Sequence, residues 1–353
     1  MAHRSSLAQL ARYSKYVFLL IFFDRDNIMM AARFCLHTSV MLLALPASPY
    51  THAQAPYPAK PIRMIVPLAA GGPSDTTARI VAPKIGEAIG QNVVVDNRPG
   101  ASGIIGTEIG LKSPPDGYTI LLVSNTISLN PAIFRKLPYD NERDMTPVSL
   151  LAATPYSLNV HPSLPAKTVK ELIALAKARP GELNHASAGQ GTGPHLAMEW
   201  FAQRARIKVQ QIVYKGGGPA MIDFIAGHTQ INLTNMITAM QHVRSGRIRA
   251  LAVSSLKRSP AAPEIPTIHE SGVPDFDEGG QHGIVAPAAL PKEVLSKLHG
   301  AIVTALRAPE LVKRLAEDGS NVVANTPDEF RTIIRNETAK WTKIVKAAGI
   351  PMQ

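Results

Sequence analysis

Short apolar runs alternate with amphipathic segments along the chain from residue 62 onward. Runs rich in isoleucine, leucine and valine, such as IRMIVP at 62–67 and TILLVS at 119–124, predict buried strands. Apolar residues spaced three and four apart predict helices at 76–89, 104–111 and 168–178. Further extended segments are predicted at 92–96, 149–160, 183–187, 210–214, 231–234, 250–254 and 283–286. This alternation is typical of an α/β fold with mostly parallel sheets flanked by helices.

Proline-rich segments interrupt the pattern. Pro46–Pro61 precedes the first strand, and the irregular segment 259–277 is typical of a connector. Beyond it, TPDE at 326–329 predicts the start of a C-terminal helix, whose Trp341 is expected to pack in the core. We therefore expect two lobes, one formed by residues 56–158 together with 276–353 and the other by residues 159–275.

Residues 1–55 have the features of an N-terminal extension and export signal. A positively charged stretch and a short apolar core follow Met29 and Met30, and AQA at 53–55 matches a signal-peptidase site. We predict that translation starts at Met29 or Met30 and that the mature protein, lacking residues 1–55, is periplasmic. The alternative is a membrane anchor formed by residues 16–47.

Composition narrows the chemistry that is available to the mature protein. The chain has 353 residues, 45% of them hydrophobic, and a single cysteine, Cys35, which lies in the segment predicted to be removed. A disulfide framework, a cysteine-ligated zinc site and a cysteine nucleophile are therefore not expected. The formal net charge of +11 favours the approach of anions, but no basic run is interleaved with aromatics. We expect no nucleic-acid partner.

Four strand-to-helix junctions are rich in glycine. They lie at 67–75, 98–103, 187–195 and 215–219. A helix start offers unpaired N–H groups and a partial positive charge, and glycine lets the backbone approach a ligand closely. Such junctions form anion sites without a charged side chain. None matches a nucleotide-binding motif, so we expect no nucleotide and no other cofactor.

Several side chains in these junctions have two interpretations. Ser74 and Asp75 either cap the first helix or, for Asp75, bind an ammonium or hydroxyl group of a ligand. Tyr214 either points its hydroxyl into a cleft or packs, and Lys215 either pairs with an anion or lies in water.

The third junction has a further interpretation as a catalytic site. Ser187 and Thr192 either bind a carboxylate or bond locally within the turn. HASAG at 185–189 loosely resembles a G-x-S-x-G nucleophile elbow, which makes a hydrolase centred on Ser187 the enzymatic alternative. His195 and Glu199 lie four apart on one helix face, but the neighbourhood has too few ligands to predict a metal.

Many segments, in order, resemble one family. The chain is similar to the substrate-binding proteins of tripartite tricarboxylate transporters, the Bug family. The resemblance rests on segments at 57–75, 93–107, 115–124, 137–151, 185–201, 213–228, 249–255 and 265–272. It implies a two-lobe periplasmic-binding-protein fold of the Venus flytrap type and a non-enzymatic receptor that delivers a carboxylate to a membrane permease. A monomer is the default for such a clamp.

The resemblance also implies a set of ligand-binding residues. The family grips a carboxylate mainly through backbone amides and ordered water in two loops, which correspond to 68–75 and 187–195. The implied residues are Leu68, Ala70, Gly71, Gly72, Ser74, Asp75, Ser124, Asn125, Ser187, Gly189, Gly191, Thr192, His195, Tyr214, Lys215 and Gly216.

Two departures from the family pattern concern the far end of the ligand. Gln281-His282 replaces a common aromatic pair, and Leu68 replaces an aromatic residue. Both imply a distal pocket that is more polar or roomier. A sensor of the same fold that signals to a membrane kinase remains an alternative to a transport receptor.

Overall fold

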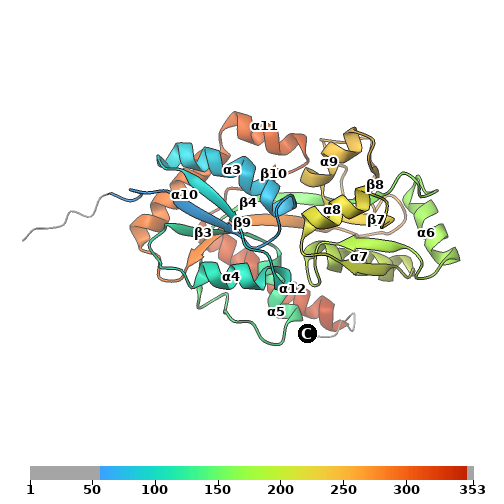
Figure 1. The fold of residues 1–353 in the computed structure, drawn as a ribbon, viewed down its shortest axis with the longest axis horizontal. Helices are drawn as coiled ribbons and strands as arrows, with labels where there is room; N and C mark the ends of the chain where they lie inside the picture. Colours follow the sequence, from blue (N-terminus) through green and yellow to red (C-terminus); the bar gives the residue numbers. More distant parts are fainter. Residues whose placement is uncertain (1–55, 348–353) are drawn as a thin grey trace, which may run out of the picture. The chain divides into compact units, whose positions relative to one another are not determined.

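In the computed structural model, which describes residues 56–347, two groups of strands share one long strand, β4 (Met145–Val160) (Figure 1). The first part of β4 pairs antiparallel with β9 (Gly279–Pro287). The last part pairs antiparallel with β7 (Ile231–Asn235) on one side and β8 (Arg249–Val253) on the other. β4 therefore runs from one group of strands into the next.

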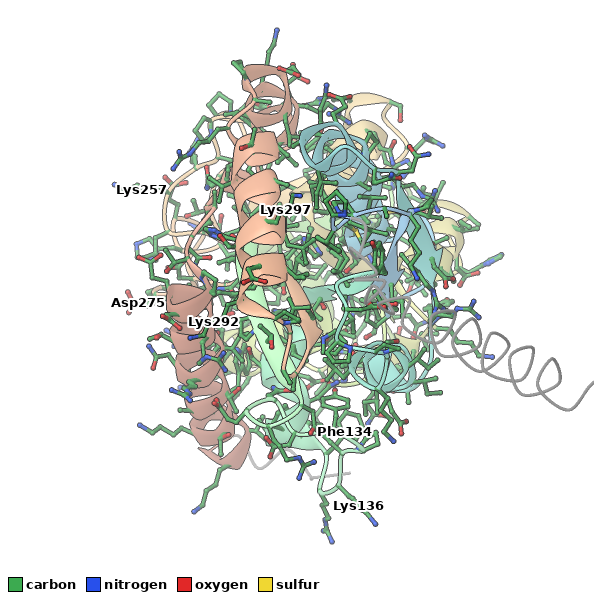
Figure 2. All side chains as sticks on the ribbon, turned by 90° about the vertical axis from the view of Figure 1, so that its left-hand side faces the viewer. Phe134, Lys136, Lys257, Asp275, Lys292 and Lys297 are labelled. Atoms are coloured by element: carbon green, nitrogen blue, oxygen red, sulfur yellow. The ribbon has the colours of Figure 1, made fainter. Side chains whose placement is uncertain are left out.

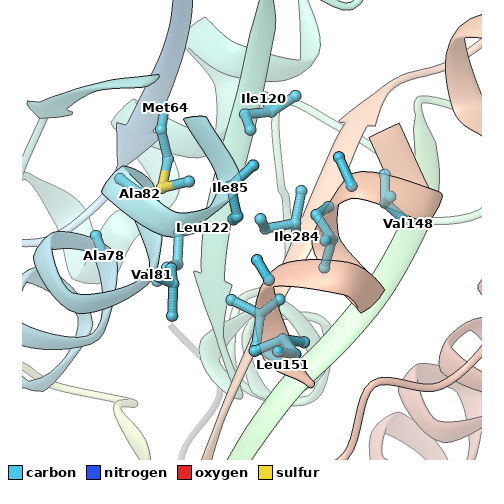
Figure 3. Packing of buried hydrophobic residues seen from close by; sticks show 14 of the residues in the cluster. Met64, Ala78, Val81, Ala82, Ile85, Ile120, Leu122, Val148, Leu151 and Ile284 are labelled. Atoms are coloured by element: carbon cyan, nitrogen blue, oxygen red, sulfur yellow. The ribbon is translucent and has the colours of Figure 1, made fainter. Parts of the chain in front are cut away.

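The first strand group carries helices on both faces. Parallel β1 (Ile62–Val66), β2 (Val93–Asn97) and β3 (Thr119–Ser124) lie beside antiparallel β9, and β10 (Asn321–Val322) pairs with β4. Figure 1 shows α3 (Pro73–Ile89), α10 (Lys292–Leu306) and α11 (Pro309–Glu317) on one face. On the other face lie α4 (Ile104–Leu111), α5 (Thr126–Ile133) and α12 (Pro327–Ala347). Figure 3 shows Val81 and Ile85 of α3 packed with Leu122 and Ile284 of the sheet.

The second strand group has the same layered construction. Parallel β5 (Asn184–Ser187) pairs with β6 (Gln210–Val213) and with β7. Residues of α6 (Val169–Ala178) and α7 (Gly193–Ala205) form one buried cluster with the strands. Residues of α8 (Gly217–Ile225) and α9 (Met236–Arg244) form another.

Three chain segments meet where the strand groups join, and Ser254 connects them by hydrogen bonds. Its hydroxyl accepts from Tyr156 N–H in β4 (2.8 Å) and donates to the carbonyl of Glu278, just before β9. Its own N–H donates to Tyr156 O (2.9 Å), and its carbonyl accepts from Glu278 N–H (3.2 Å). Ser254 is completely buried. These bonds make the three segments one hydrogen-bonded unit.

Most sequence-predicted elements are confirmed, with boundaries that differ by a few residues. The helix at 104–111 and the strand at 119–124 have the predicted bounds, and the segment 259–277 contains no helix or strand. Trp341 is 2% exposed and packs with Leu129 and Ile133 of α5. Helix α5 was not predicted from the sequence; all its residues except Pro131 are buried, so it lacks an amphipathic pattern.

The α/β class is confirmed, and the sheet is mixed. The βα units are parallel as predicted, but β4 and β9 run antiparallel to their neighbours. Residues 55–353 form one compact unit, and the lobe boundaries at 158 and 275 stay predictions. The predictions for residues 1–55 lie outside the described residues. Within 56–347 no helix is long and apolar enough to cross a membrane.

Charged side chains are distributed over the surface of the described residues. Lys136, Lys257 and Asp275 are exposed and project outward from separate segments of the chain (Figure 2).

Candidate ligand-binding cleft

A small cavity of about 40 Å³ lies where helices of both strand groups begin. Six residues predicted from the sequence line it: Leu68, Gly72, Ser74, Ser124, Asn125 and Thr192. Four polar residues that were not among the predicted site residues complete its polar wall: Thr126, Tyr156, Asn235 and His282. The cavity therefore draws on strand ends from both groups.

Five helix starts converge on this cavity. The first turns of α3, α5, α7 and α8 and the N-terminal residue Asn235 before α9 supply lining residues. None of the five N-cap residues caps its helix through its own side chain, although at α5 the Ser124 hydroxyl accepts from Thr126 N–H (3.4 Å). By contrast, α6 begins away from the cavity with Thr168 Oγ1 accepting from Glu171 N–H (3.1 Å). Uncapped helix starts carry free N–H groups and a partial positive charge.

The cavity wall within the described chain contains no Lys, Arg, Asp or Glu side chain. Its one histidine, His282, is 2% exposed, and burial lowers its pKa to about 4. The imidazole is therefore neutral at neutral pH. Its Nε2 lies 3.2 Å from Ser74 Oγ and its Nδ1 3.2 Å from Thr77 Oγ1. The described wall therefore offers an anion backbone dipoles and neutral polar side chains, and no formal charge.

Gln281 and His282 stand where the family commonly has an aromatic pair, and only His282 lines the cavity. Alternate residues of a strand face opposite sides of a sheet, and Gln281 accordingly lines a separate pocket with Glu278 and Lys340. Of the two departures from the family pattern at 281 and 282, only the one at His282 therefore changes the wall of this cavity.

The first junction is held in shape by Asp75. Gly71, with a φ of 76°, donates its N–H to Asp75 Oδ2 (2.9 Å), and Arg79 Nε lies 3.0 Å from the same oxygen. Burial raises the pKa of Asp75, but the bonds from Arg79 and Gly71 outweigh it and lower the pKa overall. Asp75 does not line the cavity. These contacts give Asp75 a structural role in the loop, although it does not cap α3, whose N-cap residue is Gly72.

The third junction bonds largely within itself. Ser187 is completely buried and its hydroxyl donates to Gly189 O (3.4 Å), while Thr192 Oγ1 donates to the same carbonyl (2.7 Å). His195 Nδ1 accepts from Gly191 N–H (3.4 Å). Ser187, Gly189, Gly191 and His195 shape the loop but do not line the cavity. Residues 56–347 contain no cluster of three His, Cys, Asp or Glu able to hold a metal.

The fourth junction packs against the first. A Cβ placed on Gly216 would lie 2.7 Å from Ala69 Cβ, and one on Gly218 would lie 2.1 Å from Ala70 O. Lys215 is exposed, and the Tyr214 hydroxyl donates to Asp223 instead of to the cavity. Burial and the Asp223 carboxylate raise the pKa of Tyr214 to about 12. Ala70, Gly71, Tyr214, Lys215 and Gly216 are thus not on the cavity wall.

The second junction makes an equivalent contact with the third. Residues 100–103 all have positive φ, including Ala101 (45°) and Ser102 (53°). This turn brings the Ser102 hydroxyl to the carbonyl of Gln190, to which it donates a hydrogen bond. The four junctions therefore meet in two pairs across the strand groups, first with fourth and second with third.

The fold and cleft define an α/β solute receptor, and comparison with known proteins identifies its family. Residues 77–350 match the model of the tripartite tricarboxylate transporter family receptor. Protein BugT of Bordetella pertussis is 37% identical over 299 residues, covering 84% of this chain and 92% of BugT. The chain belongs to this receptor family, so the resemblance seen in the sequence is confirmed.

Solved structures of related proteins share the whole described fold. The periplasmic binding protein BugD superposes with a TM-score of 0.82 at 33% identity, over 84% of this chain and 100% of BugD. Rpa4515 of R. palustris with adipate gives a TM-score of 0.81 at 32% identity, over 84% and 99% of the two chains. The protein is therefore a periplasmic solute-binding protein of the Bug family with the two-lobe α/β fold.

Proposed function

We propose that this protein captures a small carboxylate in the cavity between its two lobes and presents the closed form to the permease of a tripartite transporter. The observation that carries the proposal is the convergence of five helix starts, none capped by the side chain of its own N-cap residue, on a cavity whose wall bears no charged side chain. Such a site suits an anion small enough to be enclosed. The adipate complex of Rpa4515 supports a carboxylate as that anion.

In the proposed complex the carboxylate oxygens accept from first-turn amides of α3 and α7, one helix from each lobe. Ser74 and Thr192 lie in or next to these first turns, and Ser124 and Asn125 add side-chain polar atoms. Micromolar binding requires about 8 kcal/mol, and a few charge-assisted hydrogen bonds of about 1.5–3 kcal/mol each supply most of it. No catalytic step is needed.

The proposed lobes are residues 56–158 with 276–353 and residues 159–275, joined at Tyr156, Ser254 and Glu278. A ligand held by helix starts of both lobes interacts more strongly with the closed state than with the open one, and so shifts the equilibrium toward closure. The hydrogen-bonded segments described above are where the backbone is expected to bend.

A thermal-shift screen of the mature protein, from Pro56, against mono-, di- and tricarboxylates tests this function. A ligand that binds only the folded state raises the melting temperature. We expect a selective rise with one class of acid. Folded protein, free of co-purified ligand, that responds to no acid would contradict the proposal. Intact-mass measurement of protein from the periplasmic fraction tests the proposed removal of residues 1–55.

A further inference from the structure

Three neutral polar side chains form a cluster on the cavity wall. Tyr156 of β4 and Asn235 of β7 are direct partners in the strand register. Asn125, at the start of α5, donates from Nδ2 to the Tyr156 hydroxyl (3.0 Å). Tyr156 is 1% exposed and Asn235 is 3% exposed. All three line the cavity, and they come from both strand groups.

This cluster has hydrogen-bonding capacity that the described chain does not use. The Tyr156 oxygen accepts from Asn125, and within residues 56–347 no acceptor bonds its proton. Burial raises the pKa of Tyr156, so the phenol stays protonated and its O–H remains a donor. The Asn235 amide likewise has no side-chain hydrogen bond to the rest of residues 56–347. An unpaired buried donor or acceptor costs about 1–3 kcal/mol.

Two glycines make room for these polar atoms. A Cβ on Gly193 would lie 2.1 Å from the Tyr156 oxygen and 2.3 Å from Asn125 Nδ2. A Cβ on Gly280 would lie 2.3 Å from Asn235 Nδ2. Because any larger residue would displace the cluster, the chain provides space for a polar wall at this point.

We propose that Asn125, Tyr156 and Asn235 bind a hydroxyl group of the ligand, so that the receptor selects hydroxylated carboxylates over the parent acids that lack the hydroxyl. A hydroxyl both donates and accepts, which matches a wall with one free O–H and free amide groups. A methylene in the same place leaves these groups unpaired. Sites built to bind a hydroxyl reject the analogue without it for this reason. The inference rests on the proposed function, since the helix starts hold the carboxylate.

Calorimetric titration with acid pairs that differ by hydroxyl groups tests the inference. The pairs are malate and succinate, citrate and tricarballylate, and lactate and propionate. In the pair that binds, we expect the hydroxylated acid to bind about tenfold or more tightly than its parent. Equal or tighter binding of the parent acid overturns the inference and leaves carboxylate capture intact. Absence of binding by every acid contradicts the proposed function itself.

A pair of tyrosine variants tests the assignment to this cluster. Tyr156→Phe removes the hydroxyl that faces the cavity, and Tyr139→Phe is the matched control. Tyr139 is also buried and accepts from an asparagine amide, Asn130 Nδ2 (3.3 Å), but lies away from the cavity. We expect Tyr156→Phe to reduce the affinity ratio of the pair several-fold, and Tyr139→Phe to leave it unchanged. An unchanged ratio in folded Tyr156→Phe, judged by its melting temperature, would refute the assignment.

Discussion

Replacing Gly218 with alanine is expected to hold the lobes apart without harming either one. Gly218 lies in the first turn of α8, and its added Cβ would be 2.1 Å from Ala70 O and 3.1 Å from Ala70 C. Ordinary C···O contacts are about 3.3–3.6 Å, so the first and fourth junctions would have to separate by about 1 Å. Within α8 alanine is the better helix former by about 1 kcal/mol. The clash is therefore confined to the contact between junctions.

The free-energy cost of Gly218→Ala follows from the clash between the added Cβ and Ala70 O. Overpacking of this kind costs about 1–3 kcal/mol, and the cost applies only to the closed state. If closure is required for binding, the apparent affinity falls by about 5- to 150-fold. The melting temperature without ligand should not fall, because the open form avoids the clash. Gly218→Ala is therefore predicted to lower the ligand affinity without lowering the melting temperature of the ligand-free protein.

The assay combines calorimetry, melting temperature and small-angle scattering with the best acid from the screen. Gly300→Ala on α10 is the control, because nothing lies within 4 Å of its added Cβ. We expect weakened binding and a smaller ligand-induced decrease in the radius of gyration only in Gly218→Ala. Wild-type affinity together with normal ligand-induced compaction in that variant would show that the contact is not part of the bound state.

Three further predictions concern the contact between the second and third junctions, the buried Glu278, and the first junction. Ser102→Ala removes the hydrogen bond to Gln190 and should speed ligand release in stopped-flow measurements. An unchanged dissociation rate would show that this bond does not hold the bound state together. Glu278 has its pKa raised to about 7, mainly by burial, so the folded state holds this proton more tightly than the unfolded state, and stability is lost as pH rises from about 4.5 to about 7. Denaturant unfolding should show that the free energy of unfolding falls less between about pH 5 and pH 8 in Glu278→Gln than in the wild type. An equal fall in the two proteins would contradict this prediction. Asp75→Ala leaves Gly71 N–H and Arg79 without their partner, and should lower the free energy of unfolding by about 1–3 kcal/mol. The affinities for amino acids, hydroxy acids and simple acids should fall by the same factor. A loss of affinity confined to amino acids would show that Asp75 contacts the ligand.

Local sequence patterns were sufficient to predict the βα units and some of the residues that line the cavity. Apolar runs and helical spacing are short-range signals, so β3 and α4 could be bounded from their own residues. The rule that helix starts follow strands placed Ser74 and Thr192 at one site, and both line the same cavity, whereas Asn125 was expected only from the family resemblance. The same rule applied to β7 would have found Asn235, which ends that strand.

Residues that reach the cavity through contacts with distant parts of the chain could not be predicted from their local sequence. Tyr156 lies inside an extended segment, and only its pairing with β7 and its bond from Asn125 bring it to the cavity. A glycine-rich junction also has the same local sequence whether it faces a ligand or another junction. Gly216 was therefore assigned to the ligand, whereas in the structure it packs on Ala69. Tyr214 was likewise assigned to the ligand, but its hydroxyl bonds to Asp223.

The proposed site holds an anion although no charged side chain lies on the cavity wall, so the ligand's negative charge should decide its affinity. Calorimetry with the best acid and with its primary amide separates charge from shape, because the two compounds differ little in size. We expect the acid to bind about 100-fold more tightly than the amide, as charge-assisted bonds to several backbone amides require. Equal affinity for acid and amide would rule out binding of the carboxylate charge by the helix starts.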